Sequence, residues 1–363
     1  MQTKDILQSL ADGLPAVQLR RIPLLAADKY VLASGFQKSI RRGDTQKTAS
    51  FALSLAYADR RMLWRRLLVT AFEDIGIANP DLVAAIVAVS QNPAFRRKVG
   101  DIELALHLAR QMAASVKSRY LTEAIFLTDL GQHLSKARKS LPRASNRKLS
   151  TLILETAQPA PERFLALWGL AGTKLYAAKG FSRAGDIEEA MKTLRQLPLP
   201  AHQIEVSIAA LKSMPWPLPL FLPLALATVQ GEEFTVHKEQ PLSSPEFEAV
   251  PMYAVDPLYT RIGQSCVRQL QKQTAGLKGY SPAQMGECLF FIEGENLDRR
   301  LTSPRLEAFR QDSIDALMQD LDLGREDYQA LTRCLIKRFD AFNDIRLTQF
   351  ERSIHGTREG LLL

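Results

Sequence analysis

The sequence has 363 residues, of which 46% are hydrophobic, and a formal net charge of +8. This length and composition exclude a disordered chain and predict more than one structural unit, because single cores rarely exceed about 250–300 residues. The three widely spaced cysteines exclude a disulfide framework and a CxxC metal knuckle, and the opening MQTKDILQSLADGLP is unlike a secretion signal. We therefore expect a cytoplasmic protein.

The positive charge is concentrated at the front of the chain. Residues 1–150 hold 24 Lys and Arg against 12 Asp and Glu, whereas residues 151–363 hold 23 against 27. Such asymmetry is typical of a surface that faces a polyanion, of which nucleic acid is the commonest. A solvated basic face without a partner explains it equally well.

Apolar residues recur at helical spacing almost throughout, which predicts an all-α chain built as a multi-helix array. A first helix is expected over 28–42, ending at Gly43. Asp44 or Thr45 can cap a second helix, and Asp59 can cap a third. Short connections between these helices predict an array of helical hairpins.

The stretch VTAFEDIGIANPDL places two carboxylates, Glu73 and Asp74, at the end of the third helix. The negative pole of the helix should repel them, so we expect a structural role with cationic partners on a neighbouring helix. Gly76 then stops the helix, Asn79 caps the next one, and Pro80 takes its first position, where a missing N–H costs nothing. That next helix should run to about residue 90.

Later segments are interpreted in the same way. Two basic stretches, 92–100 and 135–148, are interpreted as connections. The apolar stretch 214–229 is interpreted as a buried irregular segment, because it is too short and too rich in proline to span a membrane. Further helices are expected over 102–115, 121–130, 160–178, 262–273, 282–291, 305–322 and 325–339. The resulting division is a lead-in helix over 1–28, a helical domain over 29–150, a helical continuation over 151–227, a proline-rich linker over 228–257 and a C-terminal helical unit over 258–363.

Recognisable catalytic chemistry is missing from the sequence. GLAGTKLY, over 169–176, has the wrong glycine spacing for a phosphate-binding GxxxxGK[ST] loop, and we find no HExxH, GxSxG, GxGxxG or Cys/His pattern. We assign no catalytic residue, no metal ligand and no cofactor. The FIEGEN hexad over 291–296 is unusual, because a glycine separates two acids. The alternative to a non-enzyme is therefore an enzyme with a site in the C-terminal half, around Asp256, Arg261, Glu293 and Glu295. The sequence favours a non-enzyme and leaves both open.

The basic residues of the front part are the best candidates for contacts with DNA. They could merge into one stripe that follows phosphates by charge without reading bases. Few aromatic residues are interleaved, which disfavours base stacking, and salt bridges between helices or subunits are the competing interpretation. The candidates are Lys38, Arg41, Arg42, Lys47, Arg60, Arg61, Arg65, Arg66, Arg96, Arg97 and Lys98.

KYVLASGFQKSIRRGDTQKTASFALSLA followed by WRRLLVTAFEDIGIANPDLVAAI resembles the C-terminal helical part of the RarA-type (MgsA-type) AAA+ ATPases. The resemblance covers about residues 29 to 130. It implies a clamp-loader-collar-like module, which in that family drives oligomerisation of ATPases that act at stalled replication forks. Only 28 residues stand before Lys29, too few for the AAA+ motor that precedes the module in the family, so ATPase activity is not implied. The shared positions are Ser34, Phe36, Lys38, Ser39, Arg41 or Arg42, Asp44, Arg65, Arg66, Glu73, Asp74, Gly76, Ala78 and Pro80.

From these features we expect a non-enzymatic accessory protein of DNA replication or repair. It would self-associate as a homo-oligomer or dock on an AAA+ ATPase, and would hold DNA through its basic face. The alternative is a protein-only scaffold, or a decoy that occupies the assembly surface of a host ATPase, such as a mobile element could encode.

Overall fold

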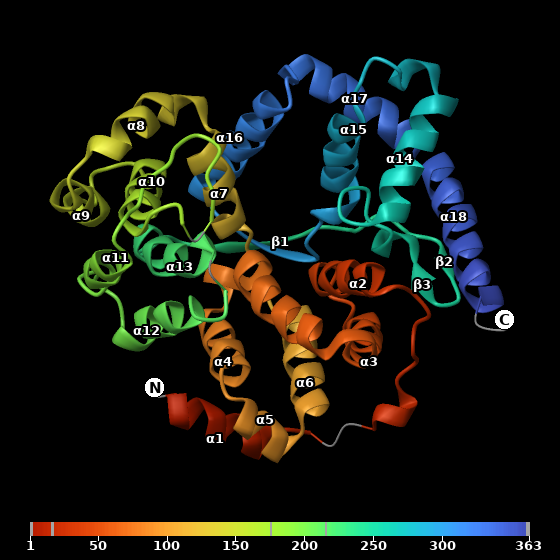
Figure 1. Ribbon diagram of the computed structural model, residues 1–363, viewed down its shortest axis with the longest axis horizontal. Helices are drawn as coiled ribbons and strands as arrows, with labels where there is room; N and C mark the ends of the chain where they lie inside the picture. The colour runs from red at the N-terminus through yellow and green to blue at the C-terminus, as the bar shows by residue number, and fades with distance from the viewer. Residues whose placement is uncertain (1–2, 16–17, 175, 215, 361–363) are drawn as a thin grey trace.

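The protein is described by a computed structural model that covers residues 3–15, 18–174, 176–214 and 216–360 (Figure 1). Helices dominate, and the four strands seen in these residues form two separate two-stranded sheets. This confirms the mainly α fold predicted from the hydrophobic spacing. No helix in the described ranges is both long enough and apolar enough to cross a membrane.

The helices fall into three groups along the chain. The first group is α1 Thr3–Gly13, α2 Lys29–Arg41, α3 Thr45–Thr70, α4 Pro80–Ser90, α5 Pro93–Val99, α6 Asp101–Ala114 and α7 Tyr120–Leu130. The second is α8 Ser135–Ser140, α9 Asn146–Leu154, α10 Ala160–Ala171, α11 Ile187–Leu194, α12 Ala201–Ala210 and α13 Pro217–Thr228. The third is α14 Arg261–Gln273, α15 Pro282–Leu289, α16 Pro304–Asp320, α17 Arg325–Lys337 and α18 Phe339–Gly360.

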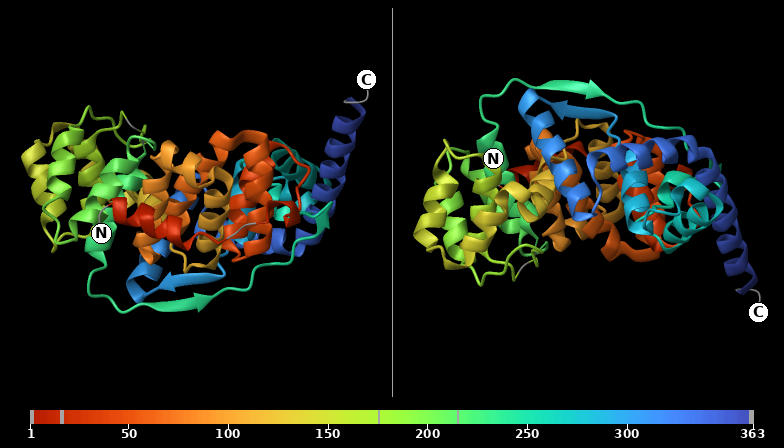
Figure 2. Two further views of the ribbon diagram at one scale, coloured as in Figure 1. Left: turned by 90° about the horizontal axis from the view of Figure 1, so that it is seen from below. Right: turned by 90° about the horizontal axis from the view of Figure 1, so that it is seen from above.

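The second group and the helices α14, α15, α17 and α18 lie on opposite sides of the molecule, whereas α16 lies beside α7 (Figure 1). A ribbon of β1 Thr235–Lys238 and β4 Arg299–Thr302 runs along one face of the molecule (Figure 2). The two strands are antiparallel, with register from Thr235 opposite Thr302 to Lys238 opposite Arg299. The smaller sheet pairs β2 Glu246–Phe247 with β3 Val250–Pro251.

Aspartate caps set the starts of the front helices, and the sequence predicts two of them, Asp44 and Asp59. Asp28 accepts hydrogen bonds from the backbone N–H groups of Tyr30 and Val31, and Asp44 caps α3 in the same way. Asp59 leaves the helical conformation inside α3 and accepts from the Met62 N–H at 3.0 Å, so that α3 is two helices joined at a kink. These caps satisfy N–H groups that would otherwise have no partner.

Three predicted connections turn out to be helical. The stretch 92–100 contains α5, which Asn92 caps, and 135–148 contains α8 and the start of α9. The stretch 214–229 is buried as expected but is not irregular, because it forms α13. Two of its prolines, Pro217 and Pro219, fall in the first turn, where no intrahelical N–H bond is lost, so only Pro223 interrupts the helix interior.

Other boundaries also differ from the sequence prediction. The helix predicted over 160–178 ends at Ala171, because Gly172 takes a φ of 93° and the chain turns back. The helices α11, α12 and α18 have no counterpart in the sequence prediction. α11 and α12 have only eight and ten residues, and α18 is polar over most of its length.

Two hydrophobic clusters support the fold. One extends from α1 to α13 and continues through the buried residues Val250, Met252, Ala254 and Val255. It also includes Leu306 and Phe309 of α16, whereas the second cluster joins α14, α15, α17 and the start of α18. The end of the proline-rich segment 228–257 is therefore part of a core, and β1 within it is paired. The division of the chain into folding units stays a prediction.

Candidate functional site

The structure separates the eleven candidate basic residues into two groups. Lys38 and Arg41 are buried, and Arg42 and Lys47 are partly buried. By contrast, Arg60, Arg61, Arg65, Arg97 and Lys98 are exposed, with Arg66 and Arg96 half-buried. The single stripe expected from the sequence is therefore not continuous at the surface.

The first group is occupied by contacts with the C-terminal half of the chain. Lys38 Nζ lies 2.6 Å from Asp256 Oδ2 and donates to the Tyr253 carbonyl at 2.9 Å. Arg42 donates to the Leu242 carbonyl, and Lys47 forms an ion pair with Glu246 at 2.7 Å. Residues held in this way have little capacity left for phosphate.

The second group, which we call the basic face, consists of the exposed and half-buried basic residues of α3 and α5: Arg60, Arg61, Arg65, Arg66, Arg96, Arg97 and Lys98. Its two parts come from α3 and α5, and they meet at Asp101, the first residue of α6. Asp101 lies 3.8 Å from Arg60 Nε and 3.5 Å from Arg96 Nη1, and it accepts from the Trp64 indole N–H at 3.3 Å. One carboxylate thus holds the two basic elements together.

Trp64 packs beneath Arg96 and Asp101, where α3, α5 and α6 meet. The Arg96 guanidinium lies 4.3 Å from the centre of a Trp64 ring, within the range of a cation–π contact. Trp64 itself is 8% exposed, so its ring packs inside while Arg96 covers it. An aromatic residue in this position fixes an arginine and does not offer a base-stacking platform.

The acidic stretch after α3 is built into the interior. Ala71–Ile75 forms a single π-helical turn, and Gly76, with a φ of 44°, ends it. Asp74 is fully buried and accepts hydrogen bonds from Gln37 Nε2 at 2.8 Å, Arg41 Nε at 2.8 Å and Arg119 Nη1 at 3.0 Å. Its cationic partners thus come from neighbouring elements, as the sequence predicts.

Glu73 is placed differently from its neighbour. Its Oε2 accepts from Gln37 Nε2 at 2.6 Å. Removal from solvent, and then the charge of Asp74, raise the pKa of Glu73. Asn79 and Pro80 start α4 as expected, with the Leu82 N–H bonded to Asn79 Oδ1 at 3.1 Å.

A second π-helical turn, Phe290–Gly294, packs against the first through shared arginines. Arg41 Nη1 donates to the Gly294 carbonyl at 2.7 Å, and Arg119 Nε lies 3.2 Å from Glu295 Oε1. Arg41 therefore joins the first turn to the second turn, and Arg119 joins the first turn to Glu295, the residue that follows the second turn. The FIEGEN hexad, which the sequence marks as unusual, contains most of this second turn and joins the C-terminal half to the front helices.

The residues of the alternative enzyme site are engaged in the same interior network. Asp256 pairs with Lys38, Glu293 pairs with Arg346 at 2.7 Å, and Glu295 pairs with Arg119. Burial alone would raise the pKa of Asp256 and of Glu293, but Lys38 and Arg346 respectively outweigh it and hold both values below the ordinary range. Arg261 is exposed at the start of α14. These residues do not converge on a shared cleft.

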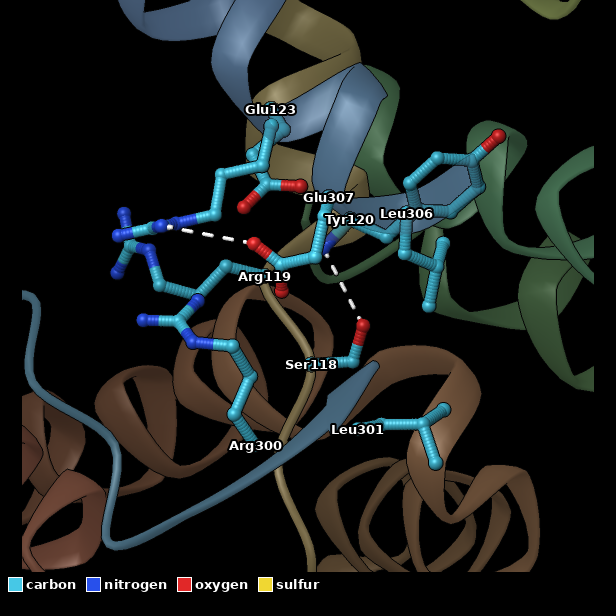
Figure 3. A pocket seen from close by; sticks show the side chains of 9 residues that line it. Ser118, Arg119, Tyr120, Glu123, Arg300, Leu301, Leu306 and Glu307 are labelled. Atoms are coloured by element: carbon cyan, nitrogen blue, oxygen red, sulfur yellow. Dashed lines mark hydrogen bonds and ion pairs between the residues drawn. The ribbon is translucent and has the colours of Figure 1, made fainter. Parts of the chain in front are cut away.

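A small polar pocket lies beside this network (Figure 3). Its volume of about 10 Å³ has room for one water molecule. Glu123 and Arg300 point into it from α7 and from β4. Burial, with the charge of Glu295, raises the pKa of Glu123 to about 7, so this carboxyl is partly protonated at neutral pH.

Residues 52–143 match the family model of the MgsA AAA+ ATPase C-terminal region. Over 101 residues the chain is 34% identical to an uncharacterised AAA domain-containing protein of Mycobacterium tuberculosis, a match that covers 26% of this chain and 22% of the relative. The chain thus spans about a fifth of the length of that relative. No solved structure matches. The matching segment, 52–143, contains the acidic turn and the basic face, and it is similar to the C-terminal region of the MgsA AAA+ ATPases.

Proposed function

We propose that the protein is a non-enzymatic accessory factor of DNA replication or repair. Its basic face holds DNA by the phosphates, and the segment 52–143 brings it to an AAA+ ATPase or to further copies of itself. Its site of action is the cytoplasm.

The observation that carries the proposal is the meeting of α3 and α5 at Asp101. Arg60 of α3 and Arg96 of α5 both lie within 4 Å of this carboxylate, and five further basic residues of the two helices are exposed or half-buried. A cluster of this kind attracts a polyanion and releases its counterions on binding, without a base-specific contact. The buried Lys38 and Arg41 contribute nothing to this surface.

The family match supports the second half of the proposal. The region that matches the MgsA-type C-terminal model includes the whole basic face, so the proposed DNA contacts and the proposed ATPase context share one segment. The acidic turn is structural in this view, since its partners are internal.

Filter binding of duplex DNA over a series of salt concentrations tests the DNA contacts. The triple variant Arg60→Glu, Arg61→Glu and Arg65→Glu should bind at least about tenfold more weakly at low salt. Its salt slope should fall by about 0.9 for each phosphate that the variant no longer neutralises. The fold should survive, because these side chains are exposed or form only a long surface ion pair.

The matched control carries the same charge change elsewhere. Lys139 of α8, Arg143 of the turn that follows α8 and Arg147 of α9 are exposed, and α8 and α9 lie on another side of the molecule from α5 (Figure 1). Reversing these three should leave most of the affinity intact. Equal reductions of affinity in both triple variants, or an affinity that ignores salt, would contradict the proposal.

A protein-only scaffold, or a decoy on the assembly surface of an ATPase, is the second candidate. Exposed apolar side chains near α2 and α3 favour it: Leu24 is 61% exposed, Tyr30 57% and Tyr57 62%. The backbone N–H of Leu25 donates to Ser54, and Lys29 pairs with Asp59, so residues 24–30 lie along this part of α3. If the protein is a scaffold, the Arg60, Arg61 and Arg65 variant should still bind its protein partner, and the double variant Tyr30→Lys and Tyr57→Lys should not. Sedimentation, or a pull-down after nuclease treatment, measures this binding.

A further inference from the structure

The second group of helices contains a cleft that the basic face and the buried network do not use. Its volume is about 480 Å³, within the range of small-molecule sites. Helices α9, α10 and α13 supply part of its wall, and the loop after α11 and the start of α16 complete it. Its lining residues are Leu154, Thr156, Arg163, Gln196, Leu197, Pro198, Ala227, Thr228, Gln230 and Arg305.

Arg163 is the unusual member of this lining. It is 3% exposed, and its Nε donates to the Ile153 carbonyl at 2.9 Å. In the part of the chain that the structure describes, no carboxylate pairs with it, and burial followed by the positive charge of Arg305 lowers its pKa. A buried guanidinium without an acid is costly unless a ligand compensates it.

Arg305 adds a second guanidinium at the cleft. It is exposed, and its Nη1 lies 3.1 Å from Glu232, which offsets part of its charge. The cleft is therefore lined by the buried Arg163, which has no acidic partner among the described residues, and by the exposed Arg305, whose charge is partly offset by Glu232. Arginine binds the oxygens of a phosphate in a forked, two-point manner that suits such a pair.

The remaining lining residues indicate which chemical group is attached to the bound anion. Leu154, Leu197 and Ala227 are apolar, whereas Thr156 and Gln230 offer exposed polar groups at the rim. A free phosphate ion would fill only part of this volume. We propose that the cleft binds the phosphate group of a small phosphorylated organic molecule, with Arg163 and Arg305 as its anion contacts and the apolar wall against the organic part.

Calorimetric titration of the full chain with inorganic phosphate and with phenyl phosphate, at constant ionic strength, tests this site. Both should bind saturably, and phenyl phosphate more tightly. Arg163→Gln should weaken both by about tenfold or more, since a charge-assisted hydrogen bond is removed. Arg195→Gln is the matched control, because Arg195 is an exposed arginine paired with Glu205, and it should bind like the unmodified chain.

Two further variants keep the test decisive if Arg163→Gln folds poorly. Arg305→Gln changes an exposed residue and should also weaken both ligands. Thr156→Trp narrows the rim and should exclude phenyl phosphate while inorganic phosphate still binds. Unchanged binding in these variants, or no binding of either ligand to the unmodified chain, would overturn the proposal.

The DNA-binding proposal and this one can fail separately. The triple variant of Arg60, Arg61 and Arg65 should keep its affinity for phenyl phosphate, since none of these three residues lines the cleft. Failure of that variant to bind phenyl phosphate would place the anion on the basic face and contradict the cleft site.

Discussion

Asp74 and Arg119 form an ion pair at 3.0 Å in which both side chains are almost completely buried. Asp74 lies in the first π-helical turn, and Arg119 continues from it to Glu295 beside the second. This pair therefore connects the MgsA-like segment to the C-terminal half. Because Arg41 also depends on Asp74, one carboxylate balances two buried guanidiniums.

We expect Asp74→Ala to lower the free energy of unfolding by about 3–5 kcal/mol, because it leaves the buried Arg41 without its acid and leaves Arg119 with Glu295 alone. Urea unfolding followed by circular dichroism measures this. Glu205→Ala breaks an exposed pair with Arg195 and should cost at most about 1 kcal/mol. Similar reductions in the two variants would show that the Asp74 pairs contribute no more than a surface ion pair.

The stability of the fold should depend on pH through Glu123. Its pKa is raised from 4.5 to about 7 by burial and by Glu295, so the folded state favours the neutral carboxyl. That contribution is present below pH 4.5 and is lost as the pH rises through 7. Glu123→Gln should therefore reduce the loss of stability between about pH 5 and pH 8 by up to on the order of 3 kcal/mol.

Urea titrations at several pH values across this range measure the effect. Glu287, whose pKa burial also raises to about 7, keeps part of the pH dependence in the variant. The exposed Glu188→Gln is the control and should follow the unmodified chain. A pH slope in Glu123→Gln equal to that of the control would refute the assignment.

The sequence was sufficient where local rules determine the structure. The caps Asp44 and Asp59, the stop at Gly76 and the start of α4 all follow from residues a few positions apart. The fold class follows from the hydrophobic period. Even the cationic partners of Asp74 could be expected, since a buried carboxylate needs them.

The sequence was insufficient where the partner is distant along the chain. Lys38 and Arg41 look like surface cations on the last turn of a helix, but their contacts Tyr253 and Gly294 lie more than 200 positions away. No local pattern reveals such contacts. The FIEGEN hexad drew attention as a chemical site for the same reason, because its two acids are explained only by Arg119 and Arg346.

Gly43→Ala should disturb the junction between α2 and the C-terminal half. Gly43 has a φ of 70°, and an added Cβ would clash with the Asp298 carboxylate. Asp298 would have to move away from Lys117, with which it pairs at 2.5 Å. We expect the free energy of unfolding in urea to fall by about 1–3 kcal/mol. Gly279→Ala is the control and should change this free energy by no more than about 0.5 kcal/mol, because the added Cβ has no atom within contact distance.

Asp101→Asn should strengthen DNA binding if the basic face is the DNA site. The carboxylate sits between Arg60 and Arg96, so its charge offsets the attraction of both for phosphate. Its removal makes both cations available, and the salt slope should steepen by about 0.9 for each additional phosphate that they neutralise. Asp312→Asn makes the same charge change at an exposed position of α16 and should leave the slope unchanged. If the two variants increase the affinity equally, net charge and not the geometry around Asp101 governs the binding.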